Sequence, residues 1–233
     1  MKKTTPHPAQ PTPAAHDFSR WAGWAVALGS FGVFVGSIVY ALSPVEAALP
    51  VPQPIWANAL RATVAGSPRL QLAGSIGVVS DVILAAGTAL FAAATARHAV
   101  ERLGWALLTL SVIIFVFVDV LAAGVLPRMA ALTGADSVYA GFKALFDTLF
   151  VAGTFTFGLG ALATLLPDRR TTARFLPKPL WWLGIAAGVL ALISTTLYLL
   201  QVAVPQMIGA SIALGTLIFA FYGAQLARHA HAA

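Results

Sequence analysis

Six long apolar runs dominate this chain and carry almost none of its charge. They cover residues 21–43, 71–96, 103–126, 142–166, 180–200 and 206–226. Each run is close to, or longer than, the roughly 20 residues that a helix needs to cross the ~30 Å hydrocarbon layer of a bilayer. Only 9% of the 233 residues are charged, whereas about a quarter are charged in a soluble domain. The sequence therefore predicts an all-α membrane protein, a bundle of six transmembrane helices surrounded by lipid.

The domain organisation follows from the positions of these runs. We expect a disordered tail at 1–20, a six-helix transmembrane domain at 21–228 and a short tail at 229–233. The first run could instead be a signal peptide cleaved near Val45-Glu46-Ala47, because Lys2 and Lys3 precede it. Its length exceeds the roughly 7–15 apolar residues of a signal peptide, which favours a retained first span.

The distribution of basic residues predicts the orientation. Ten of the 14 Lys and Arg lie in the two tails and in the second and fourth loops, and the other four are Arg61, Arg69, Arg128 and Lys143. The positive-inside rule then places both termini in the cytoplasm. Five tryptophans are expected to anchor the cytoplasmic ends of the helices, namely Trp21, Trp24, Trp105, Trp181 and Trp182. The Arg- and Ala-rich composition favours a bacterial protein, and we expect it in the inner membrane. The basic residues form no continuous face, so we expect no binding of nucleic acid.

A short pattern recurs in the second, fourth and sixth runs. Each contains a Gly-Thr pair, at Gly87-Thr88, Gly153-Thr154 and Gly215-Thr216, and an aspartate lies six residues before each of the first two. The pattern indicates either three two-helix repeats around a pseudo-threefold axis or a coincidence of residues that are common in membrane helices. Real repeats would favour a site at their interface, near the membrane midplane.

Three aspartates lie inside the predicted spans, at Asp81, Asp119 and Asp147. A charged side chain at a helix centre costs about 2.5–3.5 kcal/mol on insertion scales, so each is expected to face the bundle interior. From the helical rise, Asp81 lies about 15 Å from the outer end of its helix, Asp119 about 10 Å and Asp147 about 7 Å. All three therefore lie at the midplane or in the outer half.

Some polar residues share a helix face with these acids. Lys143 lies four residues before Asp147, a spacing that allows an ion pair along one helix. Thr88 and Thr154 follow Asp81 and Asp147 by two helical turns on the same face. We therefore include the lysine and both threonines in the candidate site.

Basic partners for the other two acids are more distant. Arg69 precedes Asp81 by twelve residues, about 18 Å along a helix. Asp119 could reach Arg128 only if the chain bends back at Pro127. The full set of candidate residues for a proton or ligand site is Asp81, Asp119, Asp147, Lys143, Thr88, Thr154 and Arg69.

The first outer loop is rich in proline. Residues Ile55–Val64 are expected to form a short helix that is separate from the second span. This helix either lies at the outer membrane interface or folds over the bundle as a lid that brings Arg61 toward the acids. We favour the interfacial placement.

Several kinds of chemistry are absent from the sequence. The chain has no cysteine, which excludes thiolate metal sites, iron–sulfur clusters and cysteine nucleophiles. The five histidines lie at the edges of spans or in the tails, at His7, His16, His98, His229 and His231. No nucleotide-binding or zinc-protease motif occurs. We therefore expect no cofactor, no metal and no catalytic residue.

Part of the chain carries motifs of a known family. A short helix at Ala57–Val64 is followed by Ser67-Pro68-Arg69-Leu70, and an acid then precedes an aliphatic run in Asp81-Val82-Ile83-Leu84. With these features, residues 56–111 resemble a bacterial six-helix membrane family known as domain of unknown function 4386. The resemblance implies a six-helix fold and a membrane location. That family has no established activity, so the resemblance implies no function, but it draws attention to Arg69 and Asp81.

Three functions fit these observations. The leading hypothesis is an outward-opening acidic site that binds or translocates a proton or a small solute. The second is a non-catalytic sensor, scaffold or accessory subunit in which the aspartates only make hydrogen bonds to Ser80, Ser111 and Thr88. The third is an enzyme that modifies a lipid or quinone with the same acids, and it lacks an evident nucleophile or redox group. The sequence predicts neither a protein partner nor an oligomeric state.

Overall fold

The computed structural model describes residues 13–95, 98–168 and 175–229. The predicted tail residues 1–12 and 230–233, and residues 169–174 of the basic fourth loop, lie outside this range. The elements are α1 (Pro13–Ala41), α2 (Val45–Ala48), α3 (Trp56–Leu90), the π-helical turn η1 (Phe91–Thr95), α4 (Ala99–Val120), the π-helical turn η2 (Leu121–Val125), α5 (Leu126–Ala131), α6 (Asp136–Asp168), α7 (Lys178–Leu199) and α8 (Pro205–His229).

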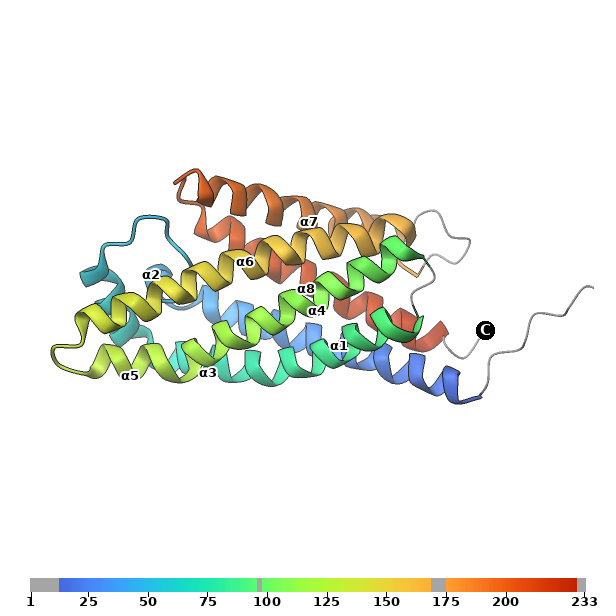
Figure 1. The fold of residues 1–233 in the computed structure, drawn as a ribbon, viewed down its shortest axis with the longest axis horizontal. Coiled ribbons are helices and arrows are strands. Elements are labelled where there is room, and N and C mark those ends of the chain that lie inside the picture. The colour runs from blue at the N-terminus through green and yellow to red at the C-terminus, as the bar shows by residue number, and fades with distance from the viewer. Residues whose placement is uncertain (1–12, 96–97, 169–174, 230–233) are drawn as a thin grey trace, which may run out of the picture.

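Six helices are long and apolar enough to cross a membrane, and no strand occurs among the described residues. They correspond to the six predicted runs, so the prediction of an all-α six-helix membrane bundle is confirmed. Figure 1 shows that α1 begins and α8 ends at the same end of the elongated bundle. We call this the terminal end, and the opposite end, where α2 and α5 lie, the distal end.

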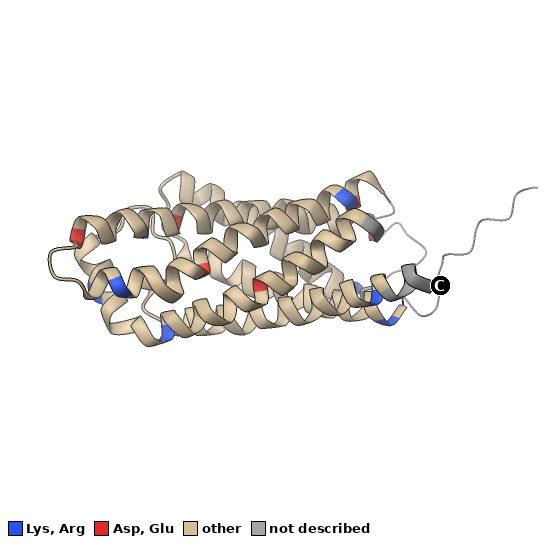
Figure 2. Cartoon of the chain, turned by 60° about the horizontal axis from the view of Figure 1, so that its bottom comes forward, with Lys and Arg blue, Asp and Glu red and all other residues tan. Residues whose placement is uncertain are grey.

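The six long helices form a closed ring. Each packs on the next in the order α1, α3, α4, α6, α7 and α8, and α8 returns to pack on α1. Basic positions lie at the two ends of the bundle, while acidic positions also occur along its middle (Figure 2). A closed ring leaves one shared interior, and polar groups inside it must find their partners there.

Small residues hold the ring together. A Cβ added at Gly223 in α8 would come within 2.6 Å of the Ala27 nitrogen and 2.7 Å of the Gly23 oxygen, both in α1. The α6–α7 contact is similarly close, since a Cβ at Gly158 would lie 2.9 Å from the Gly188 oxygen. Lipid chains are as apolar as side chains, so membrane helices associate through such close packing rather than through the hydrophobic effect.

The second span differs from the prediction. No separate interfacial helix forms at Ile55–Val64, because α3 runs unbroken from Trp56 through Pro68. Proline removes one backbone hydrogen bond, but this part of α3 is fixed on both sides. Thr63 shares a hydrogen bond of 2.6 Å with Tyr139 of α6, and Gly66 packs directly against Pro44. These contacts explain why the helix continues through the proline.

The third span is also longer than predicted, because α4, η2 and α5 follow one another without interruption from Ala99 to Ala131. Pro127 lies in the first turn of α5. The wide turn η2 begins two residues after Asp119 and ends just before α5. Such π-helical turns often lie beside functional residues. The chain does not bend back at Pro127, and Asp119 is bonded to a residue of α1 rather than to Arg128, as shown below.

Aromatic side chains fill the interior of the terminal half. Trp105 is fully buried, and its ring stacks on Phe91 at 4.7 Å and on Tyr222 at 6.0 Å between ring centroids. Phe219 meets Trp105, Tyr222 and Phe157 edge to face. We call these five residues the aromatic block. Trp105 is therefore not the interfacial anchor that the sequence predicted, whereas Trp21 is 72% exposed.

The three Gly-Thr pairs lie in matching places. Each threonine is buried and donates to the backbone oxygen four residues earlier, from Thr88, Thr154 and Thr216. The glycines before them face the preceding long helix: Gly87 faces α1, Gly153 faces α4 and Gly215 faces α7 as well as Phe157 of α6. This agreement is what three repeats would produce, and the repeat itself stays a prediction.

The α1–α8 contact yields a test of packing. Gly223→Ala should lower the free energy of unfolding by about 1–3 kcal/mol, because the new methyl group overlaps backbone atoms of α1. Gly141→Ala is the matched control, since a Cβ there meets nothing within 4 Å, and it should be neutral or stabilising by up to about 1 kcal/mol. Thermal unfolding in detergent micelles measures both, and equal effects would contradict this account of the ring.

Candidate functional site

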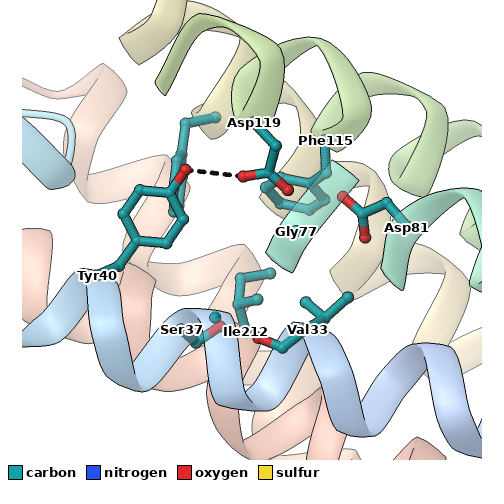
Figure 3. Close-up of a pocket in the computed structure, with 10 residues that line it drawn as sticks. Val33, Ser37, Tyr40, Gly77, Asp81, Phe115, Asp119 and Ile212 are labelled. Atoms are coloured by element: carbon teal, nitrogen blue, oxygen red, sulfur yellow. Dashed lines mark hydrogen bonds between the residues drawn. The ribbon is translucent and has the colours of Figure 1, made fainter. Parts of the chain in front are cut away.

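Two of the three intramembrane aspartates meet in the bundle interior. Asp81 on α3 is 1% exposed and Asp119 on α4 is 6% exposed. Their carboxyl groups point toward each other (Figure 3) and lie within hydrogen-bonding range. A hydrogen bond between two carboxyl groups needs a proton on one of them, because an ionised carboxylate has no donor. The pair is therefore a place where one proton can be shared.

Gly77 makes this meeting feasible. It lies one helical turn before Asp81 on α3, and a Cβ added to it would overlap the carboxyl group of Asp119. Three residues earlier, a Cβ at Gly74 would come within 2.6 Å of the Asp119 backbone oxygen. Glycine at both positions lets α4 approach α3 closely enough for the Asp119 side chain to lie across α3.

Tyr40 supplies a hydrogen-bond donor to the pair. Its hydroxyl group, near the end of α1, donates to Asp119 Oδ1 at 2.7 Å, as the dashed line in Figure 3 shows. Tyr40 is itself buried, with 8% of its surface exposed. One oxygen of Asp81, Oδ2, is buried without a hydrogen-bond partner in the described part of the chain.

A small cavity adjoins the pair. It holds about 30 Å³, enough for about two water molecules. Five helices contribute to its wall, which consists of Val33, Gly36, Ser37, Tyr40, Gly77, Asp81, Phe115, Asp119, Phe150 and Ile212. The two carboxyl groups and the tyrosine are therefore the main polar groups of an otherwise apolar chamber near the middle of the bundle.

No basic side chain balances the two acids among the described residues, where the one ion pair is Lys143–Asp147. That pair confirms the interaction predicted from the four-residue spacing. Lys143 is buried, lies over the ring of Phe146 at 4.9 Å and donates to the backbone oxygen of Leu49 at 3.4 Å. The third acid thus belongs to a separate, charge-balanced cluster at the distal end, and the expectation that all three acids share one pocket is wrong.

The other predicted site residues lie away from the cavity wall. Thr88 donates to the backbone oxygen of Leu84 and receives a hydrogen bond of 3.0 Å from Thr109. Thr154 donates to Phe150. Arg69 is exposed and donates to the backbone oxygen of Leu42 at 2.9 Å, so it does not approach Asp81.

Arg61 of the first outer loop and Ser111 also have partners other than those predicted from the sequence. Arg61 is exposed and bonds to Asn58 and to the Ala57 oxygen in its own helix, so it is no lid over the acids. Ser111, expected to bond an aspartate, donates to the Gly153 oxygen at 2.8 Å. Asp119 accepts from Tyr40 and faces Asp81 instead.

Two residues of the site were missed by sequence reasoning. Tyr40 lies at the end of the first run, where an aromatic residue normally indicates an interfacial anchor. Gly77 lies one helical turn before Asp81 on the same face, a position where a small residue is common in membrane helices. No local signal connects either residue to Asp119, which is distant in sequence.

The comparisons with known proteins find no match: no protein family, curated protein or solved structure aligns with the chain. The resemblance to domain of unknown function 4386 therefore stays a prediction.

The Tyr40–Asp119 bond can be tested by removing one oxygen. Tyr40→Phe should destabilise the protein by about 1.5–3 kcal/mol, because it takes the donor from a buried carboxyl group. Tyr139→Phe removes a bond between two neutral hydroxyl groups, so its expected cost is only about 0.5–1.5 kcal/mol. Thermal unfolding should show this order, and a larger loss in Tyr139→Phe would mean that Asp119 does not depend on Tyr40.

The distal ion pair makes a different prediction. Lys143→Met should cost about 3–5 kcal/mol, because it leaves the buried Asp147 carboxylate without its counter-charge. The double variant Lys143→Met/Asp147→Leu removes both charges and should recover most of that loss. Unfolding of the two variants side by side measures the difference, and equal stability would show that Asp147 is not charged.

Proposed function

We propose that this membrane protein binds and releases a proton at the Asp81–Asp119 pair. The observation that carries the proposal is the meeting of two buried carboxyl groups without a basic partner among the described residues. If both carboxyl groups were ionised, their negative charges would repel strongly in an interior of low dielectric constant. A proton shared between them removes that repulsion. Tyr40 orients the pair by donating to Asp119 from α1.

The size of the cavity favours a proton over an organic solute. About 30 Å³ accommodates water or a single small ion, whereas pockets for small organic molecules are typically about 300–1,000 Å³. Water in the cavity would give the carboxyl groups a partner for proton exchange. Of the two ligands that the sequence suggested, the proton therefore has the stronger support.

We further propose that the protein resides in a bacterial inner membrane with the terminal end in the cytoplasm. The support is the excess of Lys and Arg in the tails and in the loops of that end. The distal end, with α2 and the Lys143–Asp147 pair, then faces the outside. In this orientation the acidic pair lies between the midplane and the outer surface.

Infrared difference spectroscopy tests the proton site directly. The wild-type protein in lipid vesicles should show a carboxylic C=O band that appears and disappears as the pH is stepped. Asp81→Asn and Asp119→Asn should each abolish it, because an asparagine amide donates to the remaining carboxylate and replaces the shared proton. Each spectrum is compared at equal protein content and after thermal unfolding has shown that the variant is folded.

Asp136→Asn is the control, since this carboxyl group is exposed at the start of α6 and its loss should leave the band unchanged. A band that persists in both Asp81→Asn and Asp119→Asn would contradict the proposal. The aspartates would then be structural, as in the scaffold or accessory-subunit hypothesis. A band that vanishes when Na⁺ is added at constant pH would instead identify a small cation as the ligand.

A further inference from the structure

The connection between α1 and α3 closes the distal mouth of the bundle. After α1 ends, residues 44–50 turn inward around the single-turn helix α2, in which Ala47 and Ala48 are fully buried. Figure 1 places α2 at the distal end, opposite the start of α1 and the end of α8. A connection that only linked two helices would lie on the surface with its backbone in water, so the burial of this segment needs an explanation.

The contacts of residues 44–50 reach across the bundle. Pro44 packs on Gly66 of α3. At the other end of the segment, a Cβ at Gly209 of α8 would lie 3.3 Å from the Leu49 side chain. The segment therefore spans the mouth from α3 to α8.

Lys143 of α6 fastens the segment from a third side. Its ammonium group donates to the Leu49 backbone oxygen while it is held by Asp147 one turn further along α6. Glu46 of α2 lies close enough for its charge to act on Lys143, and its Oε2 atom is buried without a partner in the described structure. The lysine is thus shared between the helix that carries it and the segment above the mouth.

The cavity lies about one helical turn below this segment. Its wall residue Ile212 follows Gly209 by three positions, and Phe150 follows Asp147 by three positions. Tyr40, which bonds Asp119, precedes Pro44 by four. The segment and the cavity are therefore neighbours along the axis of the bundle.

The path from the cavity to the terminal end is closed by a larger barrier. From Asp119 to Trp105 the distance along α4 is about 21 Å, and the aromatic block fills the interior of the terminal half. Several interlocked rings would have to move together to admit water from the terminal end. At the distal end, only a short segment would have to move, which is held by the Lys143 hydrogen bond and by the packing of Pro44 and Leu49.

We infer that residues 44–50 form a lid over the acidic cavity, that the Lys143–Asp147 pair is the latch that holds it, and that ions reach the cavity from the distal end. The functional meaning of the lid rests on the proposed proton site. Access to the cavity is measurable by itself, even if the two aspartates bind no proton.

The absence of cysteine from the chain allows a test with single thiols. Ser37→Cys places a thiol in the cavity wall on α1 (Figure 3). The charged reagent methanethiosulfonate ethyltrimethylammonium is too large for a cavity of about 30 Å³ and does not enter lipid, so an increase in its reaction rate reports opening. Combining Ser37→Cys with Lys143→Met/Asp147→Leu should raise this rate about tenfold or more, the shift expected when a hydrogen bond to a charged group is lost.

Two controls separate lid opening from general loosening. Ser30→Cys lies two turns from Ser37 toward the terminal end and is fully buried, so its rate should not change in the latch variant. Thr63→Val/Tyr139→Phe removes a distal bond between α3 and α6 in which no residue of the lid or the latch takes part, and it should leave the Ser37→Cys rate unchanged.

Each outcome of these measurements either supports or overturns the lid. A faster reaction at position 37 alone, seen only with the latch variant, supports the lid. An unchanged rate at 37, an equal increase at 30 and 37, or the same increase with Thr63→Val/Tyr139→Phe would overturn it. If the infrared band persists in both aspartate variants while the rate at position 37 rises only with the latch variant, the proton site is overturned and the lid is supported.

Discussion

Two carboxyl groups that meet without a counter-charge are the constraint on which the interior of this bundle depends. Asp81 and Asp119 can occupy an apolar interior only if each finds a hydrogen-bond partner, and they find each other and Tyr40. That arrangement requires α3 and α4 to approach at Gly77, and it requires α1 to end where its tyrosine reaches α4. The positions of three helices are thus tied to one small polar centre.

The two halves of the bundle differ in what fills their interior. In the terminal half, the interior is filled by stacked and edge-to-face rings around Trp105, which leaves little room for water. In the distal half, the interior contains the acidic cavity, the buried Lys143–Asp147 pair and the inward-turned segment 44–50. This asymmetry along the axis is what gives the cavity a direction and makes the distal end the end from which it is reached.

The three intramembrane acids have a similar expected cost of insertion into the membrane, yet they have different roles in the structure. Asp147 is balanced by a lysine on its own helix, and a local spacing of four residues was enough to predict that pair. Asp81 and Asp119 have no such local partner, and their relation is set by a contact between α3 and α4. Asp119 accepts from Tyr40 of α1 and faces Asp81 of α3, so no spacing rule along one helix could have found either contact.

The sequence by itself determined that six helices cross a membrane, which residues are costly there and which lysine neutralises Asp147, because hydropathy and helical spacing act within single segments. It misjudged the ends of two spans, since Pro68 and Pro127 are tolerated where neighbouring contacts hold the helix. Only the tertiary structure decided that Asp81 meets Asp119, that Trp105 turns inward and that residues 44–50 cover the mouth. These features depend on how closely α3, α4 and α8 approach their neighbours, a distance set by the fit of side chains from segments far apart in the chain.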